Sequence, residues 1–299
     1  MARSRSHTVL CAAAFGATWL LAGCGTAEKH AAASLQDVQA VPCAGELPRT
    51  DPDAPAWQSA PEYVATLMPQ DQTEPKLTTP GVPTVRVRAL HDGAFVAFRL
   101  EWDDPTKDEL AGVGKSSDAV AVQVPVGRGG DVPDGAMGQA GRPVRITLWK
   151  AAWQAALGSK EDAVSRLYPN ARPDHYPFDA AAPSARAAME ALYAPARALG
   201  NPVTVRRTDS PTQDLAAEGF GSLTAQPDQV SVGAGLHDGR RWRVTIARPL
   251  DADENGALRA GNRTYAAFAV WNGTANEAGA RKMRSGWIPL AIAARGETR

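Results

Sequence analysis

The segment TVRVRALHDGAFVAFRLEW, residues 84–102, decides the fold of this chain. Residues 84–90 alternate between polar and apolar side chains, and residues 94–102 form a second run rich in apolar and aromatic side chains. Such runs are typical of strands with a buried face. Between them stands His91-Asp92-Gly93, where the glycine can supply the positive φ that a tight hairpin turn requires. The segment therefore predicts two antiparallel strands.

The same pattern of short strands and turns recurs along the chain. Strand-like runs occupy residues 118–126 and 143–149, and a second His-Asp-Gly turn at 237–239 separates runs at 229–236 and 241–250. Residues 265–271 and 287–293 complete the set. The 23 prolines and 27 glycines of the chain favour many short strands over long helices. We therefore predict a mainly β protein, an antiparallel β-sandwich of roughly six to nine strands.

The middle of the chain has a different pattern. Residues 150–167 and 184–199 are rich in alanine and place apolar side chains at helical spacing. The second run is followed by Gly200-Asn201-Pro202, which is a helix stop signal. We therefore expect a helical insertion at about residues 150–200, between the two halves of the sandwich. The alternative is two β subdomains joined by a helical linker.

The first 23 residues have the pattern of a lipoprotein signal peptide. Arg3 and Arg5 precede an apolar run over residues 8–22, which is shorter than the roughly 20 residues of a membrane-spanning helix. The run ends in Leu21-Ala22-Gly23-Cys24, and a cysteine after small residues is the signal for cleavage and lipid attachment. The alternative is an ordinary signal peptide that happens to contain a cysteine.

We therefore expect cleavage before Cys24 and lipidation of its thiol, which would anchor the chain on the periplasmic side of a bacterial membrane. No aspartate follows Cys24, which favours the outer membrane. Residues 24–45 are rich in alanine and lack apolar periodicity, so we expect a flexible tether there. The folded domain should then occupy residues 46–299.

Familiar catalytic patterns are absent from the sequence. The chain lacks the motifs of serine hydrolases, phosphate-binding loops and zinc peptidases, and it lacks the Cys-x-x-Cys-His motif of covalently attached haem. Once Cys11 has left with the signal peptide and Cys24 is lipidated, Cys43 is the remaining cysteine, so no disulfide is possible. The mature chain has a small excess of acidic residues and no nucleic-acid footprint. The sequence therefore predicts a non-catalytic protein.

Two segments contain less ordinary residues. Met137 stands in a glycine-rich loop between two predicted strands, where a methionine gains little unless something apolar contacts it. Lys282 stands in a loop flanked by Trp271 and Trp287. On the residues alone, a gap-filling methionine and a solvated lysine are the favoured interpretations.

A series of short motifs resembles a known family in order and spacing, and together they span nearly everything after the tether. The family is that of the haem b-binding γ subunits of type II dimethyl-sulfoxide-reductase-family enzymes, such as ethylbenzene dehydrogenase, dimethyl sulfide dehydrogenase, selenate reductase and chlorate reductase. The motifs are DPDAPAW at 51–57, VRALHDG at 87–93, FRLEWDDPTK at 98–107, AMG at 136–138, WKAAWQ at 149–154, AEGFGSLT at 217–224 and FAVWNG at 268–273.

The resemblance implies an immunoglobulin-like or DOMON-like β-sandwich that holds one non-covalent haem b between a methionine and a lysine. By motif, these axial ligands would be Met137 in Ala-Met-Gly at 136–138 and Lys282 in Ala-Arg-Lys-Met-Arg-Ser-Gly-Trp at 280–287. The family usually has a small polar residue after the lysine, whereas this chain has Met283, which is therefore a rival for the second ligand. Lys150, at a strand end, is a weaker rival. A dry pocket lined by Trp271 and Trp287 would help to keep the lysine in its free-amine form.

The resemblance also implies a function. Such a subunit would relay electrons between the iron–sulfur subunit of a molybdenum enzyme complex and an external carrier such as a c-type cytochrome. The lipid anchor departs from the better-known members, which are soluble in the periplasm. Two other readings stay open: a surface lipoprotein with a carbohydrate-binding-type sandwich and no haem, and a purely structural lipoprotein subunit.

Overall fold

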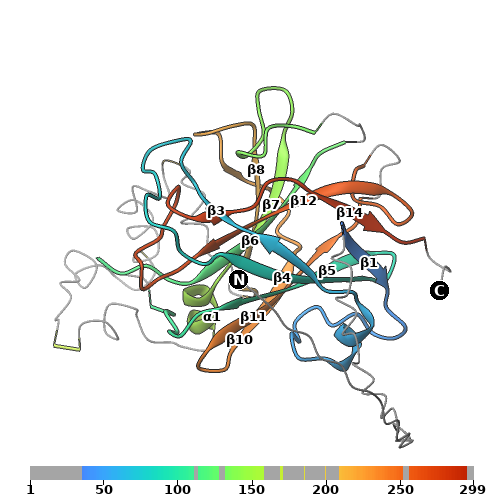
Figure 1. Ribbon diagram of the computed structural model, residues 1–299, viewed down its shortest axis with the longest axis horizontal. Coiled ribbons are helices and arrows are strands. Elements are labelled where there is room, and N and C mark those ends of the chain that lie inside the picture. The colour runs from blue at the N-terminus through green and yellow to red at the C-terminus, as the bar shows by residue number, and fades with distance from the viewer. Residues whose placement is uncertain are drawn as a thin grey trace, which may run out of the picture. The chain divides into compact units, whose positions relative to one another are not determined.

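The mainly β prediction is confirmed by a computed structural model of the chain (Figure 1). It describes residues 36–110, 114–127, 132–157, 209–251 and 256–294, with the isolated positions 169, 170, 185 and 199. These residues belong to one compact unit, Ser34–Arg299. The predicted signal peptide, Cys24 and the first part of the tether lie outside the described residues. So does the predicted helical insertion beyond residue 157, apart from isolated positions.

The described residues form fourteen strands joined in one sheet path, with the order β10-β11-β5-β4-β1-β14-β12-β6-β7-β8-β9 and with β2, β3 and β13 beside it. The strands are β1 (Val38–Pro42), β2 (Tyr63–Thr66), β3 (Met68–Pro69), β4 (Thr84–His91), β5 (Phe95–Asp103), β6 (Ala119–Pro125), β7 (Val144–Lys150), β8 (Thr212–Ala217), β9 (Thr224–Ala225), β10 (Val232–His237), β11 (Arg241–Pro249), β12 (Arg263–Trp271), β13 (Met283–Arg284) and β14 (Ile288–Ile292). Two short helices accompany them, η1 (Pro55–Ser59) and α1 (Ala151–Leu157).

Both predicted hairpins are present. Strands β4 and β5 pair antiparallel from His91 opposite Val96, and β10 and β11 pair antiparallel from His237 opposite Trp242. Gly93 and Gly239 at their turns both have a φ of 88°. This backbone conformation suits glycine because a Cβ atom is disfavoured there. The turn residues therefore fix the register of the two hairpins as the sequence predicts.

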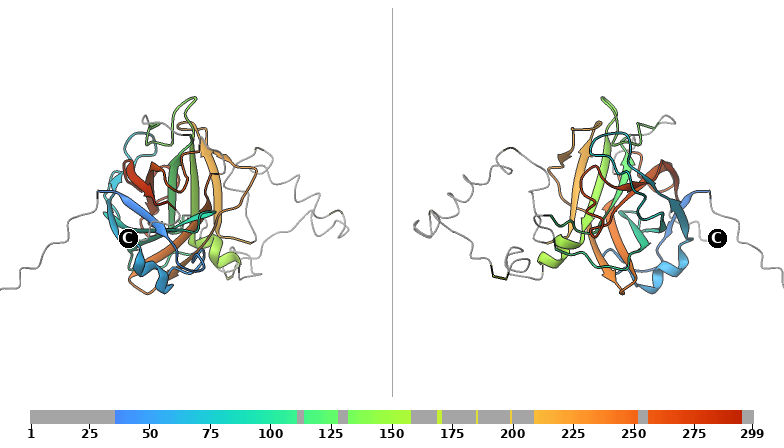
Figure 2. Two further views of the ribbon diagram at one scale, coloured as in Figure 1. Left: turned by 90° about the vertical axis from the view of Figure 1, so that its right-hand side faces the viewer. Right: turned by 60° about the vertical axis from the view of Figure 1, so that its left-hand side comes forward.

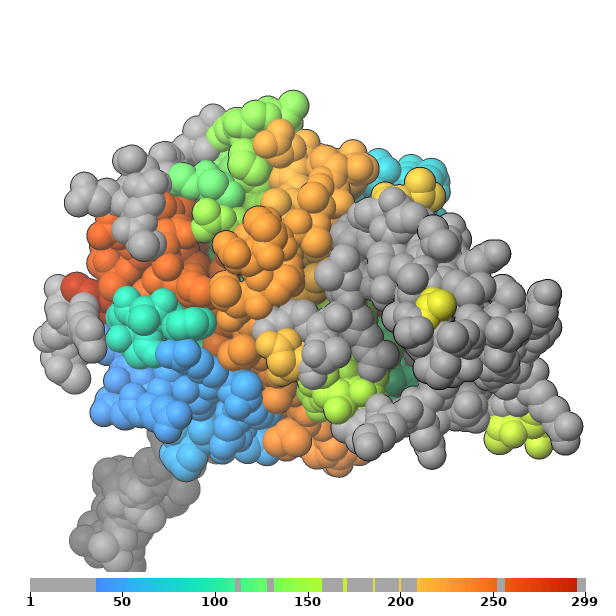
Figure 3. Space-filling view, turned by 180° about the vertical axis from the view of Figure 1, so that it is seen from behind, coloured from blue at the N-terminus to red at the C-terminus, as the bar shows by residue number. Residues whose placement is uncertain are grey.

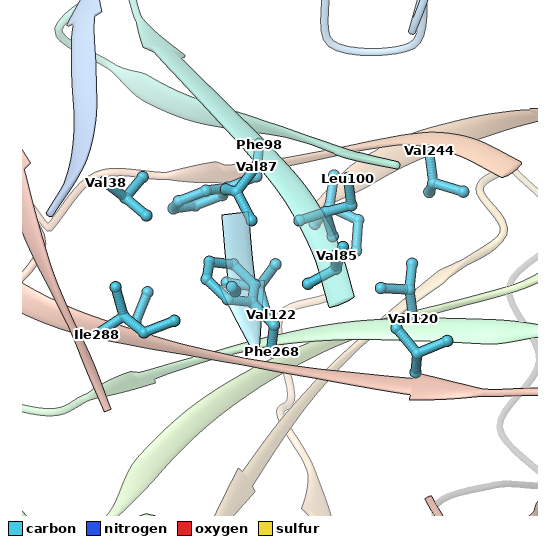
Figure 4. Packing of buried hydrophobic residues seen from close by; sticks show 14 of the residues in the cluster. Val38, Val85, Val87, Phe98, Leu100, Val120, Val122, Val244, Phe268 and Ile288 are labelled. Carbon is cyan, nitrogen blue, oxygen red and sulfur yellow. The ribbon is translucent and has the colours of Figure 1, made fainter. Parts of the chain in front are cut away.

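The single path forms two layers because β12 changes partners along its length. Its first residues, 263–266, pair with β14, whereas residues 267–271 pair with β6. The core lies between β4, β5 and β11 on one side and β6 and β12 on the other (Figure 4). There Phe98 of β5 meets Phe268 of β12 edge to face, with ring centroids 6.3 Å apart. The sandwich prediction is therefore confirmed, with β7 lying between β6 and β8 in the second layer (Figure 2).

Strand β1 corrects two details of the sequence prediction. It lies between β4 and β14 and is parallel to both, so the sheet is mixed and not wholly antiparallel. Its residues fall within the predicted tether, and that prediction is wrong for residues 38–42. Val38 and Ala40 are buried in the core, where they fill the space between the two layers. Two apolar residues at alternate positions are enough for a buried strand, but they are too few to stand out in the sequence.

The short elements were harder to predict. Helix η1 and strands β2, β3, β8, β9 and β13 fall outside the strand-like and helical runs that the sequence predicts. Figure 3 shows the segment around η1 (blue) against the segment that contains β11 (orange), where Arg243 forms an ion pair with Asp53 at 2.6 Å. Helix α1 lies where the helical insertion was expected to begin. None of the helices in the described ranges is long and apolar enough to cross a membrane.

Replacing Ala40 by aspartate tests the role of β1. Ala40 is fully buried in the core, so the variant would place an unpaired charge there. We expect its free energy of unfolding to fall by about 3 kcal/mol or more. The neighbouring Gln39→Glu, on a partly exposed side chain, is the control and should change it by about 0.5 kcal/mol or less. Urea unfolding followed by tryptophan fluorescence measures both, and equal stabilities would contradict the placement of β1.

Candidate functional site

A cavity of about 560 Å³ lies on the side of the second layer that faces away from the core. Strands alternate their side chains between two faces, and in β6 the valines point into the core while Ala119 and Ala121 line the cavity. Ile146 and Leu148 of β7 and Leu215 of β8 continue this apolar wall. The volume and apolar lining are those of a site for a small organic molecule or cofactor.

Met137 lines this cavity from the loop between β6 and β7. Its φ is 73°, in the left-handed region that residues other than glycine rarely adopt. The backbone around it is fixed by the N–H of Gly138, which donates to the carbonyl of Asp134 at 2.9 Å, and by the N–H of Gly219, which donates to the carbonyl of Met137 at 2.8 Å. A conformation of this kind costs about 1–3 kcal/mol and is often found at functional sites.

Trp287 supports the Met137 loop from its other side. Its indole N–H donates to the carbonyl of Pro133 at 2.7 Å. The side-chain amide of Gln123 holds the same loop through the carbonyl of Gly135, at 3.1 Å. Both Trp271 and Trp287 were expected to line the pocket. Trp271 does so, whereas Trp287 anchors the loop.

Lys282 lines the same cavity, although it is far from Met137 in the sequence. Its Nζ lies 5.2 Å from the ring centroid of Trp271, and its carbonyl accepts a hydrogen bond from the N–H of Gln70 at 2.9 Å. Burial, together with a smaller effect of the positive charge of Arg284, lowers the pKa of Lys282 to about 8. The free amine is therefore accessible near neutral pH, as a nitrogen ligand must be.

The side chain of Met283 points the other way. It is 2% exposed and belongs to the core between the two layers, where its sulfur accepts a hydrogen bond from the N–H of Gly81 at 3.3 Å. It does not line the cavity. Adjacent residues of an extended segment point to opposite faces, which explains why Lys282 and Met283 are separated.

Lys150, the weaker rival in the sequence analysis, also lines the cavity. It stands at the end of β7, with its Nζ 5.0 Å from the ring centroid of Trp153. Burial lowers the pKa of Lys150 as well. The structure therefore brings Met137 to the same cavity as Lys282 and Lys150, with Lys115 as a third lysine in its lining, and leaves Met283 outside.

Two other cavity residues were missed. Phe220 is exposed at the cavity and lies within the 217–224 motif, so the resemblance contained a signal for it. Glu277 is 1% exposed and lines the cavity, and one of its carboxylate oxygens has no hydrogen-bond partner among the residues that the structure describes. No motif contains it, and its burial was not predictable from the sequence. Within the described ranges, no group of three His, Cys, Asp or Glu side chains could hold a metal ion directly.

Comparison with known proteins identifies related chains. Residues 54–283 match the sequence model of a family described as ethylbenzene dehydrogenase. A protein of Haloferax mediterranei described as a respiratory nitrate reductase heme subunit is 24% identical over 268 residues, which are 88% of this chain and 76% of that protein. The chlorate reductase subunit gamma of Ideonella dechloratans is 37% identical over 86 residues, which are 26% of this chain and 36% of that protein.

The lowered pKa of Lys282 makes a prediction for the protein without a bound cofactor. Unfolding returns the lysine to its ordinary pKa of about 10.5, so between pH 8 and pH 10.5 the unfolded chain binds more protons than the folded one. Stability should therefore rise across this range, by at most about 3 kcal/mol. In Lys282→Met this contribution to the rise should disappear, because the variant has no amine to titrate.

Urea unfolding at a series of pH values measures this effect. The difference in slope between wild type and Lys282→Met isolates Lys282 from Lys150, which is present in both. Lys76→Met, at an exposed lysine outside the cavity, is the control and should behave as wild type. Parallel curves for wild type and Lys282→Met would show that Lys282 is not desolvated.

Proposed function

The chain belongs to the ethylbenzene dehydrogenase family, and we propose that it binds one haem b in this cavity and transfers electrons within a molybdenum oxidoreductase complex. The observation that carries the proposal is the cavity itself, where Met137 and Lys282 come together against an apolar wall. The names of the two relatives, a heme subunit and a γ subunit of two reductases, support an electron-transfer role.

The residues of the cavity fit a haem. A porphyrin needs apolar surface, which β6, β7 and β8 supply, and its iron needs donors such as the thioether of Met137 and the amine of Lys282. When bound, the haem would supply one-electron redox chemistry. The thioether would favour the reduced iron and so raise the potential. Two protein ligands would leave the iron no open position, which suits electron transfer and not substrate turnover.

Burial prepares Lys282 for this role. Deprotonating an ordinary lysine, with a pKa of about 10.4, costs roughly 4–5 kcal/mol at pH 7. With its pKa lowered to about 8, Lys282 requires only about 1.4 kcal/mol. The iron–nitrogen bond then has to offset a much smaller penalty.

The geometry favours Lys282 over its rivals. Met283 would have to leave the core and give up its contact with Gly81 in order to reach the cavity. Lys150 also reaches the cavity, with its amine over Trp153 as that of Lys282 lies over Trp271. Met137 and Lys282, however, also line a smaller adjoining pocket together, and Lys150 does not. We therefore propose that Met137 and Lys282 would ligate the haem iron. The variant Lys150→Met tests this choice.

The partners follow from the same family. We propose that this chain exchanges electrons with an iron–sulfur subunit, which in turn exchanges electrons with a molybdenum catalytic subunit. On its other side it would exchange electrons with an external carrier such as a c-type cytochrome. The chain would then have no catalytic site of its own.

An absorption spectrum tests the proposed function. Protein reconstituted with haem b should show a low-spin Soret band, and acid–acetone should extract all of the haem, because the chain lacks a covalent attachment motif. Met137→Ala and Lys282→Ala should each lose the low-spin signal and admit imidazole at the freed position. Met283→Leu and Lys150→Met should keep the spectrum of wild type.

Electron paramagnetic resonance of the four variants distinguishes the outcomes. Loss of the low-spin signal in Lys150→Met, with the signal kept in Lys282→Ala, would identify Lys150 as the second ligand in place of Lys282. No Soret band in any preparation would reject haem binding and favour a sandwich without a cofactor, such as a carbohydrate-binding lipoprotein.

We also propose that Cys24 carries lipid and holds the chain on the periplasmic side of a bacterial membrane, with the outer membrane favoured. The support is the Leu21-Ala22-Gly23-Cys24 pattern. Cys24→Ala should move the chain from the membrane pellet to the soluble fraction and leave its unfolding midpoint unchanged, because residue 24 precedes β1. Cys43→Ala is the control and should stay in the pellet. A Cys24→Ala chain that still pellets without its partner subunits would contradict the proposal.

A further inference from the structure

The cavity contains a carboxylate that the proposed function does not use. Glu277 lies in the loop after β12 and is almost fully buried. Its Oε2 accepts a hydrogen bond from the N–H of Asn272 at 2.9 Å, whereas its Oε1 has no partner in the described part of the chain. Burying a carboxylate with an unpaired oxygen disfavours its charged form. Burial accordingly raises the pKa of Glu277.

A second buried carboxylate is bound by the next N–H of the same loop. Gly273 donates to Oδ1 of Asp118 at 2.8 Å, and the indole N–H of Trp242 donates to its Oδ2 at 2.9 Å. Asp118 is fully buried, and burial raises its pKa to about 6. Because Ser117 and Ala119 line the cavity, Asp118 lies directly behind the cavity wall. Glu277 and Asp118 are thus connected through two consecutive backbone amides.

A third carboxylate couples the two electrostatically. Asp104 is fully buried at the end of β5, and its Oδ1 accepts hydrogen bonds from the N–H and hydroxyl of Thr106 while its Oδ2 has no partner among the described residues. The negative charge of Asp104 raises the pKa of both Glu277 and Asp118. The charge of Asp104 therefore favours a proton on Glu277 and on Asp118.

The other charged groups around these carboxylates do not neutralise them. His237 contacts the carbonyl of Asp104 at 2.9 Å, and the charged neighbour that shifts the pKa of Glu277 and of Asp118 is the carboxylate of Asp104. The remaining titratable groups that face the cluster or share the cavity are Asp108, Glu74, Lys115, Lys150 and Lys282. No ion pair with these lysines is formed by Glu277, Asp118 or Asp104 in the described part of the chain, so a proton is the partner that the carboxylates favour.

We propose that Glu277 and Asp118 form a proton-binding site that responds to the oxidation state of the haem, an inference that rests on the proposed function. One electron from a one-electron donor makes the cavity one unit more negative. One proton then passes from a hydronium ion of the solvent to a carboxylate oxygen of the pair: an O–H bond of hydronium breaks, the O–H bond of the carboxyl group forms, and water is released. The net charge of the cavity region is thereby restored, and this chain transfers a proton equivalent with each electron.

Redox titration with mediator dyes between about pH 5 and pH 9 tests the proposal on the haem-loaded protein. The midpoint potential should fall as pH rises, by up to about 59 mV per unit, the one-electron equivalent of a tenfold change. The visible spectrum should stay constant over the same range, which excludes a change of axial ligand. Glu277→Gln and Asp118→Asn should each flatten the slope. Glu46→Gln, at an exposed carboxylate, is the matched control and should keep the slope of wild type.

An infrared difference spectrum of the wild-type protein provides a second readout that needs no variant. Reduction should produce the C=O band of a newly protonated carboxyl group, and this band should shift in D₂O. A haem-loaded protein whose potential is independent of pH and which lacks this band would overturn the proposal, as would equal slopes in wild type, Glu277→Gln and Asp118→Asn. A chain without a Soret band would instead overturn the proposed function.

Discussion

Strand β6 packs against the core with one face and lines the cavity with the other, and the rest of the structure depends on this division. All seven of its residues are buried. Its valines pack in the core against the layer of β4, β5 and β11, while Ala119 and Ala121 face the cavity. The small alanines leave room above the sheet, whereas larger side chains would fill the space that a flat cofactor needs. One strand therefore stabilises the fold with one face and shapes the site with the other.

Several unfavourable features gather around that cavity. The backbone of Met137 is left-handed, the amine of Lys282 is desolvated, and an oxygen of Glu277 is unpaired. Each reduces the stability of the fold, and each is held in place by rigid surroundings such as the contact of Trp287 with Pro133. Local rules are most often broken where a protein has a function, so their coincidence at one cavity supports a single site.

Prediction from the sequence succeeded where a local pattern determines the structure. The alternating run at 84–90 and the glycines of the two turns set the β4–β5 and β10–β11 hairpins with little help from the rest of the chain. The local alternation of polar and apolar residues did not indicate β1 or β8, because the burial of these strands depends on neighbours that are distant in sequence. The same limit applies to the site. Motifs indicated Met137 and Lys282, but only the tertiary fold separates Lys282 from Met283 and brings Lys150 and Glu277 to the cavity.

The parallel placement of β1 has a mechanical consequence. The segment that precedes it leads towards the predicted anchor at Cys24, so any force on that anchor reaches the domain through Val38. Because β1 is bonded to β4 on one side and β14 on the other, such a pull loads two rows of backbone hydrogen bonds in shear. Bonds loaded in this way share the force and break together, whereas an edge strand would peel away one bond at a time. A lipid anchor at Cys24 would therefore pull on a strand in the interior of the sheet, where two rows of hydrogen bonds resist separation more strongly than those of an edge strand would.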